Sequence, residues 1–201
     1  MKISALMIPD PITITADASI EKAIEIMKVN SIRHLPVVST GNKLRGFVTL
    51  ADLKQGLIPS MLADVSLADL MIKDPIVVDP EDDIEIAARI IYNHKIGGMP
   101  VVKRNKLVGI ITESDILRAF IDMMGLLTAS SRIDVIIQDQ PGLFRKALQI
   151  ITESGGEIIN VGLPGRQAGA RIFYFRLSPC DAEMIKSALE TEGFEVVAAI
   201  T

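Results

Sequence analysis

Residues 6–53 of the chain read LMIPDPITITADASIEKAIEIMKVNSIRHLPVVSTGNKLRGFVTLADL, and residues 70–116 read LMIKDPIVVDPEDDIEIAARIIYNHKIGGMPVVKRNKLVGIITESDI. The two stretches align with an offset of 64 residues up to Val38 and 63 residues from Asn42, and 20 of the 45 positions paired without a gap are identical. Self-similarity of this length indicates that one supersecondary unit was duplicated and that the copies pack together. Two related units create related clefts between them, and we expect a functional site there.

The composition is that of a globular protein with an aliphatic core. Of the 201 residues, 49% are hydrophobic and 23% are charged, whereas 4% are aromatic and Trp is absent. The net charge of −4 argues against a nucleic-acid-binding protein, for which a basic surface is expected. No apolar run approaches the roughly 20 residues of a membrane helix, and the run at residues 3–8 is too short for a signal peptide. The single Cys180 cannot form an internal disulfide, so we expect a cytoplasmic protein.

Each copy shows the same order of local signals. An Asp-Pro-Ile turn at residues 10–12 and 74–76 leads into a short extended segment. Apolar residues at helical spacing follow, and Ser19 or Asp83 precedes them as the capping residue. A buried strand with Pro-Val-Val, a turn, a second apolar strand and a further helix complete the copy. The predicted unit is therefore β-α-β-β-α.

The last third of the chain follows a different pattern. Small polar residues at 128–131 indicate a linker. Beyond it we predict a strand at 133–137, a helix after the turn at 139–142, a hairpin around the Gly-rich turn at 164–169, a helix at 181–192 and a strand at 195–200. The order β-α-β-β-α-β is that of a ferredoxin-like two-layer sandwich. We therefore expect a mixed α/β (α+β) chain with two repeats at 1–63 and 64–127, a linker at 128–131 and a C-terminal domain at 132–201.

The doubled unit resembles the CBS domain, which occurs in tandem as a CBS pair or Bateman module. The resemblance covers residues 1–127 and rests on the heptapeptide Gly-apolar-apolar-Thr-x-x-Asp at 46–52 and 109–115, together with the two Pro-Val-Val strands. It implies two β-α-β-β-α units packed as a pair. It also implies an adenosine-containing ligand: an adenine nucleotide (AMP, ADP or ATP), NAD or S-adenosylmethionine.

The Thr and Asp of each heptapeptide have two interpretations that the sequence leaves open. They form a capping box, in which Thr caps the helix and Asp reaches back to it. They also suit a ligand, because a carboxylate at a helix start accepts hydrogen bonds from the two hydroxyls of a ribose. The glycine of each heptapeptide, Gly46 or Gly109, is expected to leave space for a ligand to approach the backbone.

Carried over residue by residue, the resemblance implies two ligand sites. The residues of the first site are Thr13, Ile14, Leu35, Pro36, Thr49 and Asp52. The residues of the second site are Val77, Val78, Met99, Pro100, Thr112 and Asp115.

The two sites are expected to differ in charge. Arg33 and His34 precede the first Pro-Val-Val strand, where basic residues contact phosphate in the family, and an arginine suits phosphate through its planar fork. The second copy has Gly97 and Gly98 there, which leave room but no charge, and Ser114 and Arg118 are partial substitutes. We expect a phosphorylated ligand at the first site and a nucleoside or nothing at the second. A solvated Arg33 is the alternative.

The C-terminal part resembles the ACT domain through residues 139–143, Asp-Gln-Pro-Gly-Leu, directly after its first strand. ACT domains often bind amino acids at this loop, usually at a dimer interface. The resemblance therefore implies a ligand contact at Gly142, beside a helix N-terminus. The alternative is a plain helix start with Pro141 at the first helical position.

No catalytic constellation is visible in the sequence. His34 and His94 stand at non-equivalent repeat positions, and neither has a cysteine or acidic residue beside it at ligand spacing, so we expect no metal site. The chain has no Gly-x-Ser-x-Gly motif, Walker-type loop or Cys-x-x-Cys motif. We therefore do not expect an enzyme.

These observations predict a regulatory ligand-binding protein that controls a metabolic enzyme. The order of two CBS units and an ACT unit is similar to that of acetoin-utilization proteins, which implies a link to acetoin catabolism. We expect a homodimer, with no membrane and no nucleic acid among its partners. The alternative is a structural scaffold with empty clefts, in which the Thr and Asp residues are helix caps only.

Overall fold

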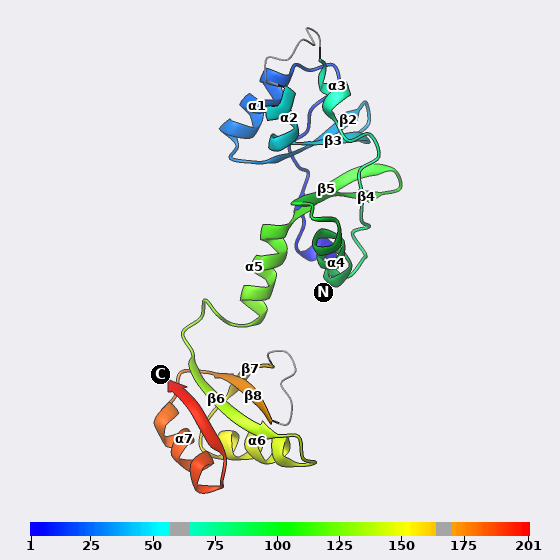
Figure 1. Ribbon diagram of the computed structural model, residues 1–201. Coiled ribbons are helices and arrows are strands. Elements are labelled where there is room, and N and C mark those ends of the chain that lie inside the picture. The colour runs from blue at the N-terminus through cyan, green and yellow to red at the C-terminus, as the bar shows by residue number, and fades with distance from the viewer. Residues whose placement is uncertain (57–64, 164–169) are drawn as a thin grey trace. The chain divides into compact units, whose positions relative to one another are not determined.

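The computed structural model describes residues 1–56, 65–163 and 170–201 (Figure 1). They form two compact units, residues 1–117 and 118–201. The elements of the repeats are η1 (Ile3–Ala5), β1 (Ile8–Pro9), α1 (Ile20–Val29), β2 (His34–Ser39), β3 (Lys43–Thr49), α2 (Leu50–Gly56), α3 (Leu67–Leu70), α4 (Ile84–His94), β4 (Gly98–Lys103), β5 (Lys106–Thr112) and α5 (Glu113–Met123). The C-terminal elements are β6 (Ser131–Gln138), α6 (Leu143–Glu153), β7 (Ile158–Gly162), β8 (Ala170–Leu177), α7 (Ala182–Thr191) and β9 (Glu195–Ile200).

Both repeats have the predicted β-α-β-β-α order. The first strand of each is a single parallel bridge, Ile14 to Val37 and Val78 to Val101. The antiparallel hairpins β2–β3 and β4–β5 have equivalent registers, each with a shift inside its Pro-Val-Val segment. Apolar residues of the first repeat pack between the hairpin and the helices α1 and α2. The duplication seen in the sequence is therefore also a duplication of structure.

The repeats exchange their leading segments. Leu67, in the helix that precedes the second repeat, is fully buried in the apolar cluster of the first repeat. Ile3 stands 64 positions earlier and is also fully buried, and its N–H donates to the carbonyl of Asp82 in the second repeat. Strand pairing follows the same exchange, since Ile8 pairs with Ile110 of β5 and Ile72 pairs with Phe47 of β3. Each half of the pair is thus completed by chain that belongs to the other.

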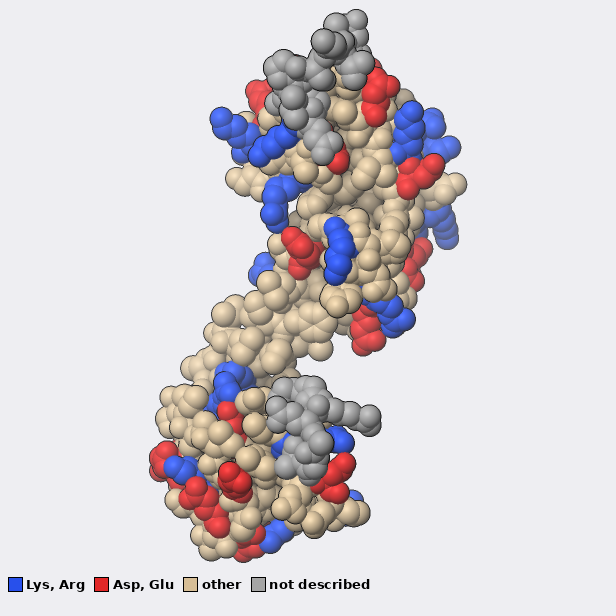
Figure 2. Space-filling view, in the orientation of Figure 1, with Lys and Arg blue, Asp and Glu red and all other residues tan. Residues whose placement is uncertain are grey.

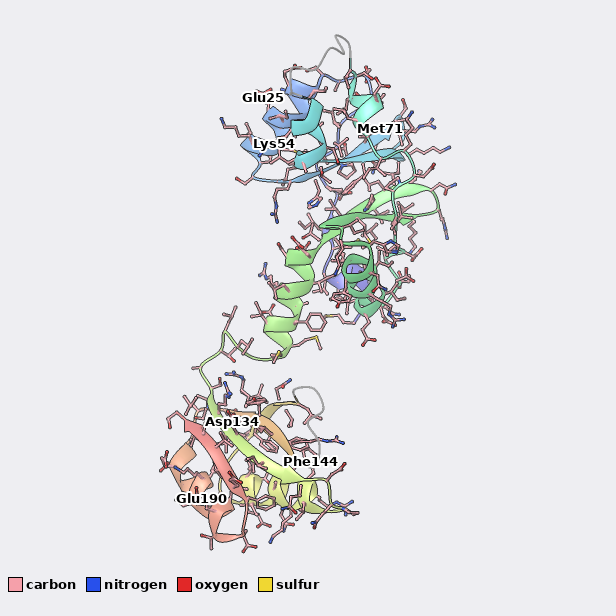
Figure 3. All side chains as sticks on the ribbon, in the orientation of Figure 1. Glu25, Lys54, Met71, Asp134, Phe144 and Glu190 are labelled. Carbon is pink, nitrogen blue, oxygen red and sulfur yellow. The ribbon has the colours of Figure 1, made fainter. Side chains whose placement is uncertain are left out.

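Gly46 and Gly109 allow this exchange. A Cβ on Gly46 would lie 2.6 Å from Met71 Sδ and 3.0 Å from the Ile72 carbonyl oxygen, and a Cβ on Gly109 would lie 2.6 Å from Met7 Sδ. Figure 3 labels Met71 at the end of α3. The expectation that these glycines leave space for a ligand was wrong, because the crossing segments fill that space.

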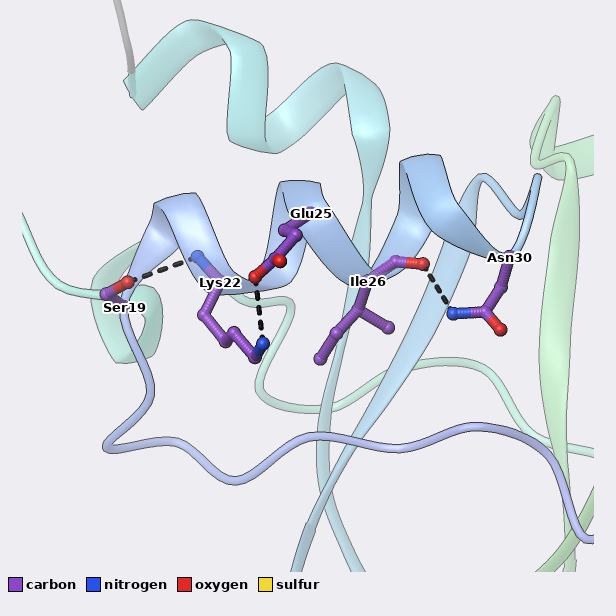
Figure 4. A network of polar contacts seen from close by, with 5 residues as sticks. All are labelled: Ser19, Lys22, Glu25, Ile26 and Asn30. Atoms are coloured by element: carbon purple, nitrogen blue, oxygen red, sulfur yellow. Dashed lines mark hydrogen bonds and ion pairs between the residues drawn. The ribbon is translucent and has the colours of Figure 1, made fainter.

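Helix α1 begins where the sequence predicts, directly after Ser19 (Figure 4). Ser19 accepts a hydrogen bond from the backbone N–H of Lys22 at 3.1 Å, which satisfies an amide at the helix start. Lys22 and Glu25 form an ion pair at 2.8 Å one turn later. At the other end, the Asn30 side chain donates to the carbonyl of Ile26 at 2.8 Å.

Helix α4 begins differently: Asp83 holds the N-cap position, as the sequence predicts, but it does not cap the helix with its side chain. The Asp83 carboxylate lies 3.1 Å from Lys2 Nζ, and the amide of Ile84 donates to the carbonyl of Met1 at 2.9 Å. The N-terminal segment therefore supplies a hydrogen-bond acceptor for an amide at the start of α4 and a cation for the Asp83 carboxylate.

The C-terminal unit has the predicted β-α-β-β-α-β order. Its antiparallel sheet has the strand order β7-β8-β6-β9, and helices α6 and α7 pack on one face around Ile133, Val135 and Phe175 (Figure 1). The predicted hairpin turn at 164–169 lies outside the described residues.

Two local expectations in this unit were wrong. Ser131 belongs to β6 rather than to a linker, because its buried hydroxyl donates to the carbonyl of Cys180 and accepts from the Cys180 amide, both at 3.0 Å. Pro141 does not open α6. The helix begins at Leu143 after Gly142, whose φ of 92° favours glycine.

We predict that Gly46→Ala loosens the crossing of the two segments. Its Cβ would push Met71 and the backbone of Ile72 away from β3, at a cost of about 1–3 kcal/mol. Hydrogen exchange should become faster at the amides of Phe47 and Ile72, which pair at 2.9–3.0 Å. Gly162→Ala is the matched control, because a Cβ there meets no atom closer than 3.7 Å. Unchanged protection of Phe47 and Ile72 would contradict the role assigned to Gly46.

Candidate functional site

A cavity of about 650 Å³ lies within the first unit, and both repeats line it. Its volume falls in the usual range for small-molecule sites. The first repeat contributes Arg33, His34, Phe47, Thr49, Leu50, Ala51, Asp52 and Lys54. The second repeat contributes Ile72, Asp74, Pro75, Ile76, Lys95, Ile96, Gly97, Gly98 and Glu113. The prediction of a cleft between the copies therefore agrees with the structure.

Thr49 and Asp52 stand in the cavity wall at the junction of β3 and α2. The Asp52 carboxylate accepts hydrogen bonds at Oδ2 from the Thr49 hydroxyl at 2.7 Å and from the Thr49 amide at 2.9 Å. Thr112 and Asp115 repeat this arrangement, with distances of 2.6 and 2.8 Å. The capping interpretation is thus realised in both repeats. No described residue donates to Asp52 Oδ1, so capping leaves that half-buried oxygen available to a ligand.

His34 brings the two repeats together at the cavity. Its ring stacks on Phe47 with 5.8 Å between centroids, and its Nε2 lies 2.8 Å from the place where a Cβ on Gly97 would stand. The expected room at Gly97 is therefore filled by the imidazole of the first repeat, and that expectation was wrong. Burial lowers the pKa of His34, with a smaller lowering by Arg33 and opposite effects of Glu113 and Asp52.

Charges of both signs surround the cavity. Arg33, Lys54 and Lys95 provide the cations, and Figure 3 labels Lys54 on α2. The carboxylates come from Asp52, Asp74 and Glu113, and Glu113 Oε1 lies 3.7 Å from a guanidinium nitrogen of Arg33. Both members of that pair are more than half exposed, so it contributes little to stability and leaves Arg33 free to bind an anion. On the face shown in Figure 2, basic and acidic side chains are interspersed over both units.

The structure brings together some of the predicted site residues and separates others. Of the first site, Arg33, His34, Thr49 and Asp52 line the cavity. The other predicted residues do not line it: Thr13, Ile14, Leu35, Pro36, Val77, Val78, Met99, Pro100, Thr112, Ser114 and Asp115. Several of these, such as Leu35 and Met99, are buried in the apolar core. Gly142 lies in the C-terminal unit, exposed at the start of α6.

The residues that sequence reasoning missed come mainly from the second repeat. Asp74–Ile76 line the cavity from the stretch of chain between two bridges, that of Ile72 to Phe47 in the first repeat and that of Val78 to Val101 in the second. Their identity with residues 10–12 was a signal, but it was interpreted as a turn. Lys95, in the left-handed conformation at the end of α4, had no signal in the sequence.

The CBS domain family model matches residues 3–58 and 67–122. The chain belongs to the CBS domain family. Its two CBS domains form the pair that the repeat predicted, with the mixed α/β fold of the first unit. The family match ends at residue 122, within α5, and does not include β6 or the elements that follow it.

Among curated proteins, the homoserine O-acetyltransferase of Methanosalsum zhilinae is 36% identical over 115 residues. The match covers 57% of this CBS protein but only 23% of the enzyme, so the chain spans about a quarter of that relative's length. The shared part is the CBS pair, and the name of the enzyme describes the longer protein.

Solved structures match the CBS pair over nearly their whole length. A putative acetoin utilization protein (AcuB) from Vibrio cholerae is 34% identical, with a TM-score of 0.57 over 63% of this chain and 94% of that one. The CBS pair of protein MJ0100, in complex with 5′-methylthioadenosine and S-adenosyl-L-methionine, is 28% identical, with a TM-score of 0.55 over 60% and 95%. CBSX2 in complex with AMP is 29% identical, with a TM-score of 0.54 over 60% and 96%.

Within residues 1–56, 65–163 and 170–201, no three His, Cys, Asp or Glu side chains are grouped to hold a metal ion. None of the helices in this part of the chain is long and apolar enough to span a membrane.

We predict that His34 titrates below its usual pKa and that this makes the stability of the fold depend on pH. The unfolded chain, with a histidine pKa of about 6.5, takes up the proton first as the pH falls. The stability contributed by neutral His34 is therefore complete above about pH 6.5 and is lost as the pH falls through the lower pKa of the folded protein.

The measurement is an NMR titration of the imidazole signal in the His94→Gln variant, which leaves His34 as the one histidine. The free energy of unfolding of the wild type should also fall relative to that of His34→Gln between about pH 7.5 and pH 5.5. A His34 midpoint at or above the usual value would contradict the burial described here.

Proposed function

We propose that the CBS pair is a regulatory sensor of an adenosine-containing ligand, which binds in the cavity between the repeats. One observation carries the proposal. Asp52 presents a carboxylate oxygen in the cavity wall while Thr49 holds the other oxygen, so the carboxylate is oriented before a ligand arrives. A ribose offers two adjacent hydroxyls to such an acceptor. The complexes of the MJ0100 CBS pair and of CBSX2 support this ligand class, because their ligands share adenosine.

The charges around the cavity favour a ligand with an anionic part. Arg33, Lys54 and Lys95 come from different elements, and Arg33 can present its planar fork to a phosphate. The carboxylates of Asp74 and Glu113 oppose a long phosphate chain. We therefore propose a ligand with one phosphate, such as AMP, in preference to ATP. The second site, around Thr112 and Asp115, remains a prediction.

The regulation follows from the position of the cavity. A ligand there contacts both repeats and favours the arrangement of the pair that it fits best, by its difference in affinity for the alternatives. The output is a metabolic enzyme, and the similarity to AcuB supports acetoin utilization as the pathway. We further propose that the chain is a cytoplasmic homodimer, and that residues 132–201 form an ACT-like, ferredoxin-like domain that contributes to the dimer or binds an amino acid at Gly142. The repeat boundaries 1–63 and 64–127 belong to the same proposal.

We predict that Asp52→Asn weakens AMP binding by roughly tenfold or more, because a hydrogen bond to a charged group contributes about 1.5–3 kcal/mol. The measurement is a calorimetric titration of the whole chain with AMP, S-adenosylmethionine and ATP. AMP at about 100 times its Kd should also raise the free energy of unfolding of the wild type by about 2.7 kcal/mol.

Asp69→Asn is the matched control. Asp69 accepts from Ser66 in the same way, at 2.6 Å from the hydroxyl and 3.1 Å from the amide, but it does not line the cavity. The Asp69→Asn variant should be less stable than the wild type but should bind AMP with the same affinity. If no adenosine compound binds the wild type, or if Asp52→Asn binds AMP as the wild type does, the scaffold with capping residues only replaces the sensor. Asp115→Asn separately tests the second site.

A further inference from the structure

A second cavity, of about 350 Å³, lies in the C-terminal unit, and all of its walls belong to that unit. The sheet has two faces, and the apolar core between the sheet and helices α6 and α7 occupies one of them. The cavity lies on the other face, among side chains of β6, β7 and β8. It is distinct from the CBS cavity and from the loop at Gly142.

The residues of β7, β8 and β6 on this face stand in two rows that run across the strands. In the first row Asn160, Arg176 and Arg132 lie side by side across β7, β8 and β6. In the second row Gly162 and Asp134 pair with Tyr174 from its two sides, and Figure 3 labels Asp134 on β6. Because Gly162 has no side chain, the second row is open above β7.

The two rows together carry more positive than negative charge. The Arg132 guanidinium donates hydrogen bonds to both carboxylate oxygens of the buried Asp134, at 2.7 and 2.6 Å. The same guanidinium lies over the Tyr174 ring. Arg176 stands directly opposite Arg132, and like charges in that position repel. Within the described residues no carboxylate lies within ion-pair distance of Arg176, whose guanidinium donates to the Ser130 hydroxyl at 2.7 Å. Residues 164–169 contain no Asp or Glu. Arg176 is therefore a half-buried cation without a carboxylate partner among the described residues, and a bound anion would stabilise it.

The rest of the cavity wall is apolar. Met124 and Leu126 belong to the segment between α5 and β6, which lies against the sheet. The Asn160 side chain donates to the Met123 carbonyl at 3.3 Å. Gly125, with a φ of 64°, lies so close to the sheet that a Cβ would be 3.3 Å from Arg176 Cδ. A guanidinium beside two aliphatic side chains suits an anion with a short hydrocarbon chain.

We propose that this cavity binds a small aliphatic carboxylate. Its carboxylate pairs with the Arg176 fork, and its hydrocarbon chain lies against Met124 and Leu126. A bound carboxylate removes the repulsion between Arg176 and Arg132. It also holds the segment between α5 and β6 on the sheet, because Met124 and Leu126 belong to that segment.

The test uses the tyrosine fluorescence of the whole chain. The sequence has two tyrosines and no tryptophan, and Tyr92 is 73% exposed. In the Tyr92→Phe variant all tyrosine emission therefore comes from Tyr174, in the cavity wall. Titration with 4-methylpentanoate should change this emission saturably. The uncharged 4-methylpentan-1-ol tests the need for the charge, and inorganic phosphate tests the need for the hydrocarbon chain.

Arg176→Gln, in the same background, should weaken binding of 4-methylpentanoate by roughly tenfold or more. Arg171→Gln is the matched control: it makes the same change of charge on the same strand, but Arg171 pairs with Asp139 at 3.1 Å and does not line the cavity. Arg176→Lys keeps the charge without the fork and should retain weaker binding, which separates lost binding from a failure to fold. The proposal is overturned if the emission does not saturate, if the alcohol or phosphate binds as well as the carboxylate, or if Arg176→Gln binds like the control.

Discussion

The close approach of two backbones at Gly46 and Gly109 is the constraint on which the CBS pair depends. Each glycine admits the segment that leads into the other repeat, so that Ile72 pairs with Phe47 and Ile8 pairs with Ile110. A side chain at either position would separate these segments. The two repeats are consequently one folding unit, because neither has a complete core without chain from its neighbour.

The same crossing builds the candidate site. Asp74–Ile76 lie between the bridge of Ile72 to β3 and the bridge of Val78 to β4, and they line the same cavity as Thr49 and Asp52. His34 of the first repeat lies against Gly97 of the second repeat in the cavity wall. A ligand in this cavity therefore contacts elements of both repeats. This coupling between site and interface is what a regulatory module requires, since a ligand acts through its different affinity for alternative arrangements.

Features that depend on local chemistry could be predicted from the sequence. The repeat predicted the order of the elements, and Ser19 predicted the start of α1. The Thr-x-x-Asp motifs predicted where each strand passes into a helix. Features that depend on distant chain could not. Asp83 holds the predicted N-cap position, but its carboxylate pairs with Lys2 of the N-terminal segment. Ser131 is held in β6 by hydrogen bonds to Cys180, 49 residues away. The cavity has lining residues of both kinds. Asp52 could be predicted from its motif, whereas Lys95 and Asp74 could be assigned to the cavity only from the arrangement of the two repeats.

A crystal structure of the whole chain with AMP would show whether the ligand binds between the repeats. We expect density for the ribose within hydrogen-bonding distance of Asp52 Oδ1, with Thr49 still bound to Oδ2 and the ligand in contact with residues of both repeats. Density for AMP elsewhere on the molecule, or an empty cavity at saturating AMP, would contradict this expectation.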